Sequence, residues 1–210
     1  MSRFSQAISE GDGISLVPTL AADVAALAAA AEEAGAEAIS VPGAGDARAA
    51  REAGGLSVLV REPVRTLAEL RGLAEAGADA FVLVYERLEG EGHLLEELHA
   101  TGLELDLDCA LDVHDDEDLE AALGRVDPDI VLISRRSNGS DEEELERALD
   151  LLPDVPAGKL VVAESEVLTR DQVLALERAG VDALIVRNLG AAADFSRVVE
   201  ELAGGAQPPR

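Results

Sequence analysis

The sequence predicts an α/β fold, a single (β/α)8 TIM barrel over residues 1–203 with a flexible tail at 204–210. Three observations support this prediction. Short apolar runs rich in β-branched residues alternate with longer stretches of helical period, which favours a parallel sheet covered by helices. One helix-to-strand junction recurs along the chain. The length of 210 residues is also ordinary for one barrel.

Each predicted strand is a short apolar run, and each predicted helix carries Ala, Leu, Glu or Arg at helical spacing. The strands are residues 14–17, 38–41, 57–61, 80–84, a fifth within 103–113, then 129–134, 160–164 and 183–187. The helices are residues 22–34, 44–53, 66–76, 94–100, 116–123, 141–151, 170–179 and 193–202. Their strict alternation predicts a parallel sheet rather than a sandwich.

The junction pattern explains how three of these helices end. It reads EAGAEAISV at 33–41, EAGADAFVL at 75–83 and RAGVDALIV at 178–186. In each copy a helix ends, a glycine takes the left-handed conformation, an acid follows, and a buried strand begins. Acidic runs at 115–118 and 141–144 stand at the starts of two further helices, where the positive end of the helix dipole stabilises carboxylates. Three copies fit a closed barrel better than an open sheet.

The composition is strongly acidic. Forty-three Asp and Glu residues against 17 Lys and Arg give a net charge of −26. Such a surface repels phosphate backbones and anionic lipids, so we expect neither a nucleic-acid partner nor a membrane partner. We find no apolar run of membrane-spanning length and no secretory signal, and therefore expect a cytoplasmic protein. Salt adaptation and a GC-rich genome both remain explanations of the acidity.

Cysteine, lysine and histidine, which often act as nucleophiles, acids, bases or metal ligands, are scarce in this sequence. Cys109 is the single cysteine of the sequence, which excludes an intrachain disulfide and a cysteine-built zinc site. We expect no metal and no cofactor. Lys159 is the single lysine, and it precedes a strand, at the barrel face opposite the usual site. His93 and His99 flank a predicted helix and are expected at the surface.

Functional residues of such barrels lie at the carboxyl ends of the strands and in the loops that follow. Arginines and carboxylates finish several predicted strands here, which suits a small anionic ligand held by guanidinium groups. We expect one mouth to collect Arg61, Asp112, Ser134, Glu164 and Arg187. His114 also follows a strand and is a candidate acid or base.

Several stretches resemble one family. They are AEAGADAFVLV at 74–84, LDVHDDEDLEAAL at 111–123, AESEVLTRDQV at 163–173 and LERAGVDALIV at 176–186. They are similar to strand four, the Val-Glu-Val-His-Asp segment, and strands seven and eight of indole-3-glycerol phosphate synthase. The likeness runs in order over residues 20–203. It implies a phosphate-binding barrel that closes and decarboxylates a carboxyphenylamino-deoxyribulose phosphate, forming the indole ring of tryptophan.

The resemblance also implies roles for residues. That chemistry requires a lysine acid, partner carboxylates and glycine amides that bind the phosphate. Transferred position by position, the catalytic residues are Arg61, Asp112 and Glu164, with Asp108 as the alternative to Asp112, and the substrate-binding residues are Ser134, Arg136, Ser165, Arg187 and Asn188. The family also carries a histidine at the position of His114, where the resemblance implies a structural role.

The sequence departs from the family where the chemistry is most demanding. Arg61 replaces the general-acid lysine, and an arginine keeps its proton far above neutral pH. Glu166 and Arg187 replace glycines, and the first-strand charges are absent at 16–19. We therefore predict a degenerate active site with weak or altered activity, in a monomer or weak homodimer. Two alternatives stay open: a non-catalytic paralogue that binds a small anion or a partner, and another enzyme that holds a phosphorylated substrate with its arginines.

Overall fold

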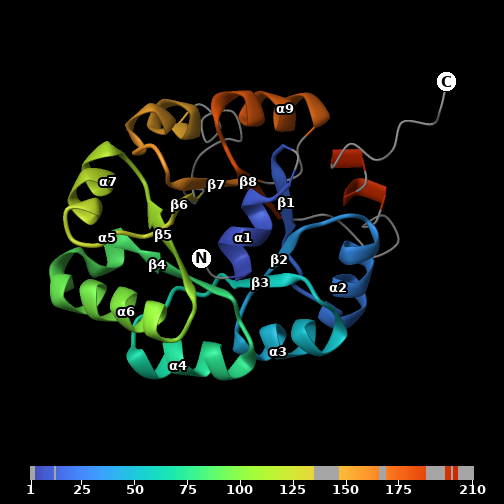
Figure 1. Cartoon of the computed structure of the whole chain (residues 1–210), viewed down its shortest axis with the longest axis horizontal. Helices are drawn as coiled ribbons and strands as arrows, with labels where there is room; N and C mark the ends of the chain where they lie inside the picture. The colour runs from blue at the N-terminus through green and yellow to red at the C-terminus, as the bar shows by residue number, and fades with distance from the viewer. Residues whose placement is uncertain are drawn as a thin grey trace.

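The barrel predicted from the sequence is confirmed. A computed structural model of the chain describes residues 3–11, 13–134, 147–165, 169–187, 197–199 and 201–202. One parallel sheet has the strand order β1-β8-β7-β6-β5-β4-β3-β2. The strands are β1 (Ser15–Pro18), β2 (Ala38–Val41), β3 (Ser57–Val60), β4 (Ala80–Val84), β5 (Asp108–Val113), β6 (Ile130–Ile133), β7 (Leu160–Ser165) and β8 (Ala183–Val186). Figure 1 shows these strands as a ring inside a layer of helices.

The first and second strands close the ring through contacts between Thr19, directly after β1, and Ser40 within β2. A parallel bridge joins Thr19 to Ser40. The backbone N–H of Leu20 donates to the Ser40 carbonyl at 2.8 Å, and the hydroxyls of Thr19 and Ser40 lie 2.7 Å apart. These bonds satisfy backbone groups that an open sheet would expose along its edges.

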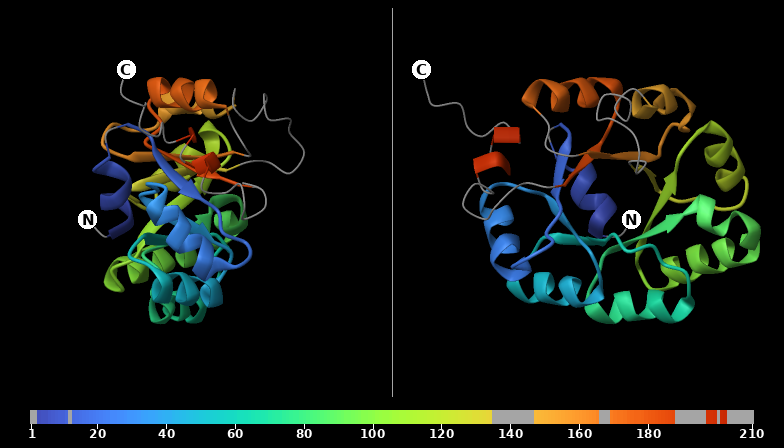
Figure 2. Two further views of the ribbon diagram at one scale, coloured as in Figure 1. Left: turned by 90° about the vertical axis from the view of Figure 1, so that its right-hand side faces the viewer. Right: turned by 180° about the vertical axis from the view of Figure 1, so that it is seen from behind.

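The helices lie outside the ring, except for one. The outer elements are α2 (Val24–Glu33), α3 (Ala44–Ala53), α4 (Leu67–Ala76), α5 (Tyr85–Leu88), η1 (Glu89–Glu91), α6 (Gly92–Glu104), α7 (Asp116–Leu123), η2 (Leu152–Asp154) and α9 (Arg170–Ala179). Residues 147–151 are also helical, as are 197–199 and 201–202, within the predicted helices 141–151 and 193–202. Figure 2 shows the layer from the side and from behind.

The repeated junction has the predicted geometry. Gly35, Gly77 and Gly180 have φ angles of 86°, 82° and 103°, in the left-handed region that side chains disfavour. At two of these glycines the N–H groups cap the last carbonyls of α4 and α9. The chain therefore turns sharply from each helix into the next buried strand.

The fifth strand lies within the predicted range 103–113, but the helix before it is longer than the predicted 94–100. The helix α6 extends to Glu104, and β5 begins at Asp108. Gly102 lets the helix continue against the sheet, because a Cβ there would meet the Phe81 ring at 2.5 Å. Leu103 faces outward and is 59% exposed. The same helix buries His99, which had been expected at the surface.

The sequence interpretation contained no counterpart of α1 (Arg3–Ser9), the helix inside the ring in Figure 1. Its side chains Phe4 and Ile8 are buried among the inward-facing residues of the strands. The Ser5 N–H donates to Asp108 Oδ2 at 2.6 Å, and the Ser15 hydroxyl donates to the Ile8 carbonyl at 3.1 Å. Because Asp108 and Ser15 begin their strands, α1 closes the amino-terminal end of the barrel.

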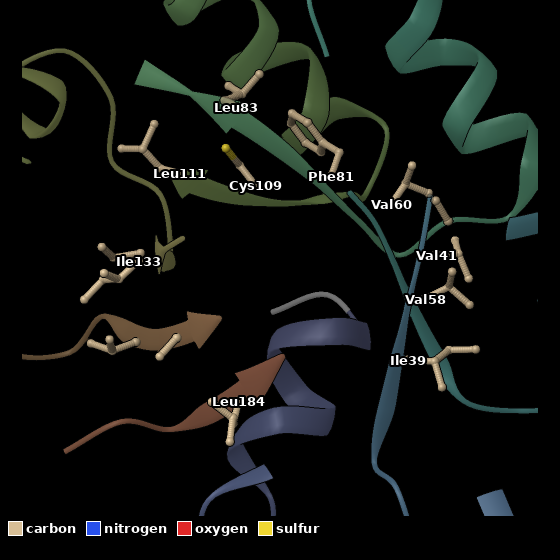
Figure 3. Packing of buried hydrophobic residues seen from close by; sticks show 14 of the residues in the cluster. Ile39, Val41, Val58, Val60, Phe81, Leu83, Cys109, Leu111, Ile133 and Leu184 are labelled. Atoms are coloured by element: carbon tan, nitrogen blue, oxygen red, sulfur yellow. The ribbon is translucent and has the colours of Figure 1, made fainter. Parts of the chain in front are cut away.

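Side chains alternate between two apolar layers along the strands. One layer fills the space between the sheet and the helices, and Figure 3 labels ten of its residues, among them Ile39, Phe81 and Leu184. The other layer fills the barrel interior. Its strand residues are Val17, Ala38, Leu59, Ala80, Val82, Val84, Ala110, Ile130, Leu132, Val162, Ala183 and Ile185. The barrel is therefore packed below the mouth rather than open along its axis.

Candidate functional site

The inward-facing alternation continues past the strand ends and places polar side chains in the mouth. Each of five polar residues stands two positions after an interior residue: Arg61 after Leu59, Asp112 after Ala110, Ser134 after Leu132, Glu164 after Val162 and Arg187 after Ile185. A strand directs residues two apart to the same side. All five line one cavity of about 530 Å³, so the expected convergence on one mouth is observed.

Other residues complete the cavity wall. Apolar side chains from Pro63, Val82, Val84 and Leu132 contribute to it. His114 follows β5, and Glu86 and Arg87 enter from the single turn α5, directly after β4. The cavity therefore combines a mainly basic region near β3, β7 and β8 with a hydroxyl and a carboxylate near β5 and β6. Its volume is within the usual range of small-molecule sites.

A carboxylate between two guanidinium groups forms the basic region. The Glu164 side chain is only 2% exposed, and both Nη groups of Arg61 donate to its two oxygens, with the Nη2–Oε2 bond at 2.7 Å. The Nε of Arg187 lies 2.8 Å from Glu164 Oε1, but its N–H does not point at that oxygen. Glu164 thus holds Arg61 firmly and Arg187 mainly by charge.

A buried carboxylic acid marks the other side of the mouth. Asp112 accepts hydrogen bonds from the Ser134 hydroxyl at 2.7 Å and from the Ser134 N–H at 3.3 Å. Burial raises the pKa of Asp112 from 3.8 to about 6, with a smaller contribution from the Glu164 charge, while the Ser134 hydrogen bonds and His114 oppose the rise. Asp112 can therefore exchange a proton near neutral pH.

His114 borders this acid. Its Nε2 lies 3.4 Å from the exposed Glu86 carboxylate, and its Nδ1 is buried with no hydrogen-bond partner among the described residues. Arg147 donates to the Ser134 carbonyl at 2.8 Å and lies 3.5 Å from the His114 carbonyl. These contacts fix the ends of β5 and β6, which carry Asp112 and Ser134.

The remaining sequence candidates lie elsewhere. Ser165 follows Glu164 on the opposite side of β7, so its side chain does not line the cavity. Arg136, Asn188 and Glu166 lie outside the described residues. Asp108 lies at the opposite end of the barrel, so Asp112 is the β5 acid that lines the cavity. Lys159 also lies at that end, as the sequence predicted, and it pairs with Asp127.

Two residues of the mouth were not among the predicted site residues. Glu86 and Arg87 follow β4 and belong to a helical turn, so strand alternation does not place them. Their position directly after a buried strand was the available signal. Across the described part of the chain, no group of three His, Cys, Asp or Glu side chains is arranged to hold a metal ion. None of the helices described is long and apolar enough to cross a membrane.

The pKa of Asp112 gives a stability prediction. Because the folded-state pKa is above the unfolded value, ionisation destabilises the fold, and stability is lost as pH rises from about 4 through 6. Asp112→Asn removes this titration. The unfolding free energy of the unsubstituted protein, relative to this variant, should fall by about 3 kcal/mol between about pH 4 and pH 8. Urea unfolding across this pH range measures the difference.

Asp116→Asn is the matched control, since Asp116 is exposed in the first turn of α7. It should follow the unsubstituted protein at every pH. If the unfolding free energies of Asp112→Asn and the unsubstituted protein change in parallel with pH, ionisation of the buried Asp112 does not destabilise the fold.

Comparison with known proteins agrees with the sequence likeness. Residues 17–202 match the family described as indole-3-glycerol phosphate synthase. An indole-3-glycerol phosphate synthase of Geobacillus thermodenitrificans is 32% identical over 193 residues, covering 87% of this chain and 73% of that protein. That of Campylobacter fetus is 32% identical over 123 residues, covering 57% of this chain and 46%, about half, of that protein.

Solved structures match the barrel itself. The 3-keto-L-gulonate-6-phosphate decarboxylase of Vibrio cholerae superposes with a TM-score of 0.71 at 13% identity, over 91% of this chain and 96% of that one. At this identity the likeness concerns the fold alone.

Proposed function

The chain belongs to the indole-3-glycerol phosphate synthase family, and we propose that it is a divergent member that binds a small phosphorylated anion but has lost most ring-closing activity. The observation that carries this proposal is Arg61. It stands where the family has its general-acid lysine, and both of its Nη groups are engaged by the buried Glu164.

The chemistry of an arginine explains the expected loss. A general acid must release its proton to the reacting group and recover it in each cycle, which requires a pKa near the working pH. A guanidinium group holds its proton far above that pH. The lysine of this chain does not replace it, because Lys159 lies at the opposite end of the barrel. Arg61 can therefore stabilise negative charge but is a poor proton donor.

Other chemistry remains available in the mouth. Asp112 can exchange a proton, and Glu164 can orient the two arginines. In this proposal Arg61, Asp112 and Glu164 form the residual catalytic group. The proposed substrate-binding residues are Ser134, Arg136, Ser165, Arg187 and Asn188, of which Ser134 and Arg187 line the cavity. The family name supports a phosphorylated ligand.

The second candidate function is a non-catalytic paralogue that binds a small anion or a partner. The engagement of Arg61 by Glu164 also favours it, because a guanidinium held in this way suits binding better than proton transfer. The two candidates differ in residual turnover. Growth without tryptophan is a sensitive readout of that turnover.

We expect the gene not to restore wild-type growth to a tryptophan auxotroph that lacks the synthase. The reason is the missing ammonium acid at position 61. Growth rates in medium without tryptophan measure the effect, with protein amounts matched by immunoblot. The Geobacillus relative, expressed in the same strain, is the positive control. Slow growth supports the divergent synthase, no growth supports the non-catalytic paralogue, and wild-type growth overturns the proposal.

A further inference from the structure

Arg187 is the mouth residue with the most unused hydrogen-bonding capacity. Its contact with Glu164 lacks hydrogen-bond geometry, and its Nε–H is buried with no acceptor among the described residues. A buried N–H without an acceptor is costly, so it favours an arrangement that supplies one. The side chain is also 32% exposed, which leaves the guanidinium accessible from the cavity. The Nε–H of Arg61 is likewise buried without an acceptor among the described residues, but both Nη groups of Arg61 already donate to Glu164, which leaves Arg187 with more free donors.

The charges around the cavity balance when every acid is ionised. The described lining contains three arginines, Arg61, Arg87 and Arg187, and three carboxylates, Glu86, Asp112 and Glu164. A neutral cavity lining attracts an anion only weakly, because the net charge of −26 on the whole chain repels it. Protonation of one carboxylate leaves a surplus positive charge beside the arginines. Because Asp112 is buried and faces the cavity, its proton changes the local field more than that of the exposed Glu86.

We infer that Arg187 binds one oxyanion group of the ligand in the mouth, and that Asp112 controls the affinity of this binding. The affinity is low when Asp112 is ionised and higher when Asp112 is protonated. The inference rests on the proposed function only in placing the phosphorylated ligand in this mouth. It adds the residue that receives the oxyanion and the group that regulates the affinity. Arg187 replaces a glycine of the family, so this mode of binding is particular to the chain.

The surroundings of Asp112 determine the pH range of this control. The groups that share its cavity are Ser134 from β6, Glu164 from β7, Arg61 after β3, Arg187 after β8, His114 after β5, and Glu86 and Arg87 from α5. Burial raises the pKa of Asp112 to about 6. Affinity for an anion should therefore rise as pH falls through that value. Protonation of His114 acts in the same direction, so a variant that changes Asp112 alone is needed.

Sulfate is a suitable probe because its charge is constant over the pH range of interest. The Nε–H signals of the arginines in ¹H–¹⁵N NMR spectra report binding at the guanidinium groups, and Arg61→Met and Arg187→Met assign them. We expect sulfate to bind about tenfold more tightly at about pH 5.2 than at about pH 7.8. Arg187→Met should weaken binding at the lower pH by at least about tenfold, as the loss of a charged hydrogen bond implies.

Asp112→Asn separates the effect of Asp112 on sulfate affinity from the general loss of negative charge at low pH. The variant should bind sulfate at the higher pH as tightly as the unsubstituted protein does at the lower pH, and should lose most of the pH dependence. Arg71→Met removes an exposed arginine of α4 and should leave sulfate binding unchanged.

Three results would overturn the inference. They are an undiminished pH dependence in Asp112→Asn, unchanged binding in Arg187→Met, and no sulfate-induced shift at the lower pH. The first two results concern only how the oxyanion is held and leave the proposed function standing, and the growth assay measures the loss of ring closure separately, so failure here and failure of the proposed function are distinguishable.

Discussion

Purified protein is expected to form indole-3-glycerol phosphate at least about a thousandfold more slowly than a synthase that carries the family's lysine. General acid catalysis contributes about 10²–10⁴-fold, and Arg61 cannot supply it at neutral pH. Glu166 and Arg187 keep their backbone amides, but they add side chains where the family's glycines leave these amides open to phosphate, and the Glu166 charge repels it, which adds to the loss. The fluorescence of the indole product gives the rate under steady-state conditions.

Two variants test whether Arg61 causes this loss. Arg61→Lys supplies an ammonium group at the same strand end and keeps a positive partner for Glu164. It should raise the rate above that of the unsubstituted protein. Arg61→Met removes the charge and should not raise it. A rate in the unsubstituted protein close to that of the lysine-bearing synthase would show that ring closure does not depend on an ammonium acid here.

Glu164→Gln is expected to lower the free energy of unfolding by about 3 kcal/mol. Removing one partner of a buried ion pair typically costs about 3–5 kcal/mol, because the remaining charge is left without compensation. The partial exposure of Arg61 and Arg187, 22% and 32%, places the effect at the lower end of this range. Urea unfolding near neutral pH measures the change, with the slope of the transition checked for constancy.

Glu201→Gln is the matched control. Glu201 also pairs with an arginine, Arg197, at 3.3 Å, but both side chains are about two-thirds exposed. Its substitution should cost less than about 0.5 kcal/mol, since exposed ion pairs contribute little. Equal stability of Glu164→Gln and the unsubstituted protein would mean that Glu164 does not neutralise the arginines of the mouth.

The parts of the fold that depend on local pattern were predictable. The three helix–glycine–strand junctions have the expected left-handed glycines, and α3, α7 and α9 have the predicted bounds. The alternation of side chains along the strands also predicted the position of the site residues. Arg61 and Glu164 stand two residues beyond interior positions, so their convergence follows once the strands are known.

The same period bears on one predicted residue. Ser165 immediately follows Glu164, and successive strand residues point to opposite sides. The family likeness placed Ser165 in the site, but its side chain does not line the cavity. A role of Ser165 in binding therefore stays a prediction that rests on the family likeness and not on strand phase. No observation tests Arg136 or Asn188, which lie outside the described residues.

Features that depend on distant contacts were not predictable. The helix α1 is only seven residues long, and its stability comes from burial of Phe4 and Ile8 against several strands. The spacing of these two residues, four apart, was its only local signal. The extension of α6 to Glu104 depends on the close packing of Gly102 against Phe81, and the same helix buries His99 against the rest of the barrel. In each case tertiary contacts outweigh local propensity.

The central claim is that this mouth retains binding while its ring-closing chemistry is impaired, and one single-turnover experiment tests both parts. Carboxyphenylamino-deoxyribulose phosphate is mixed with excess protein, and the bound fraction and the indole product are followed in the same sample. The account predicts saturable binding, with the substrate recovered unchanged over a period in which a lysine-bearing synthase converts all of it. Rapid conversion of the bound substrate, or the absence of saturable binding, would contradict it.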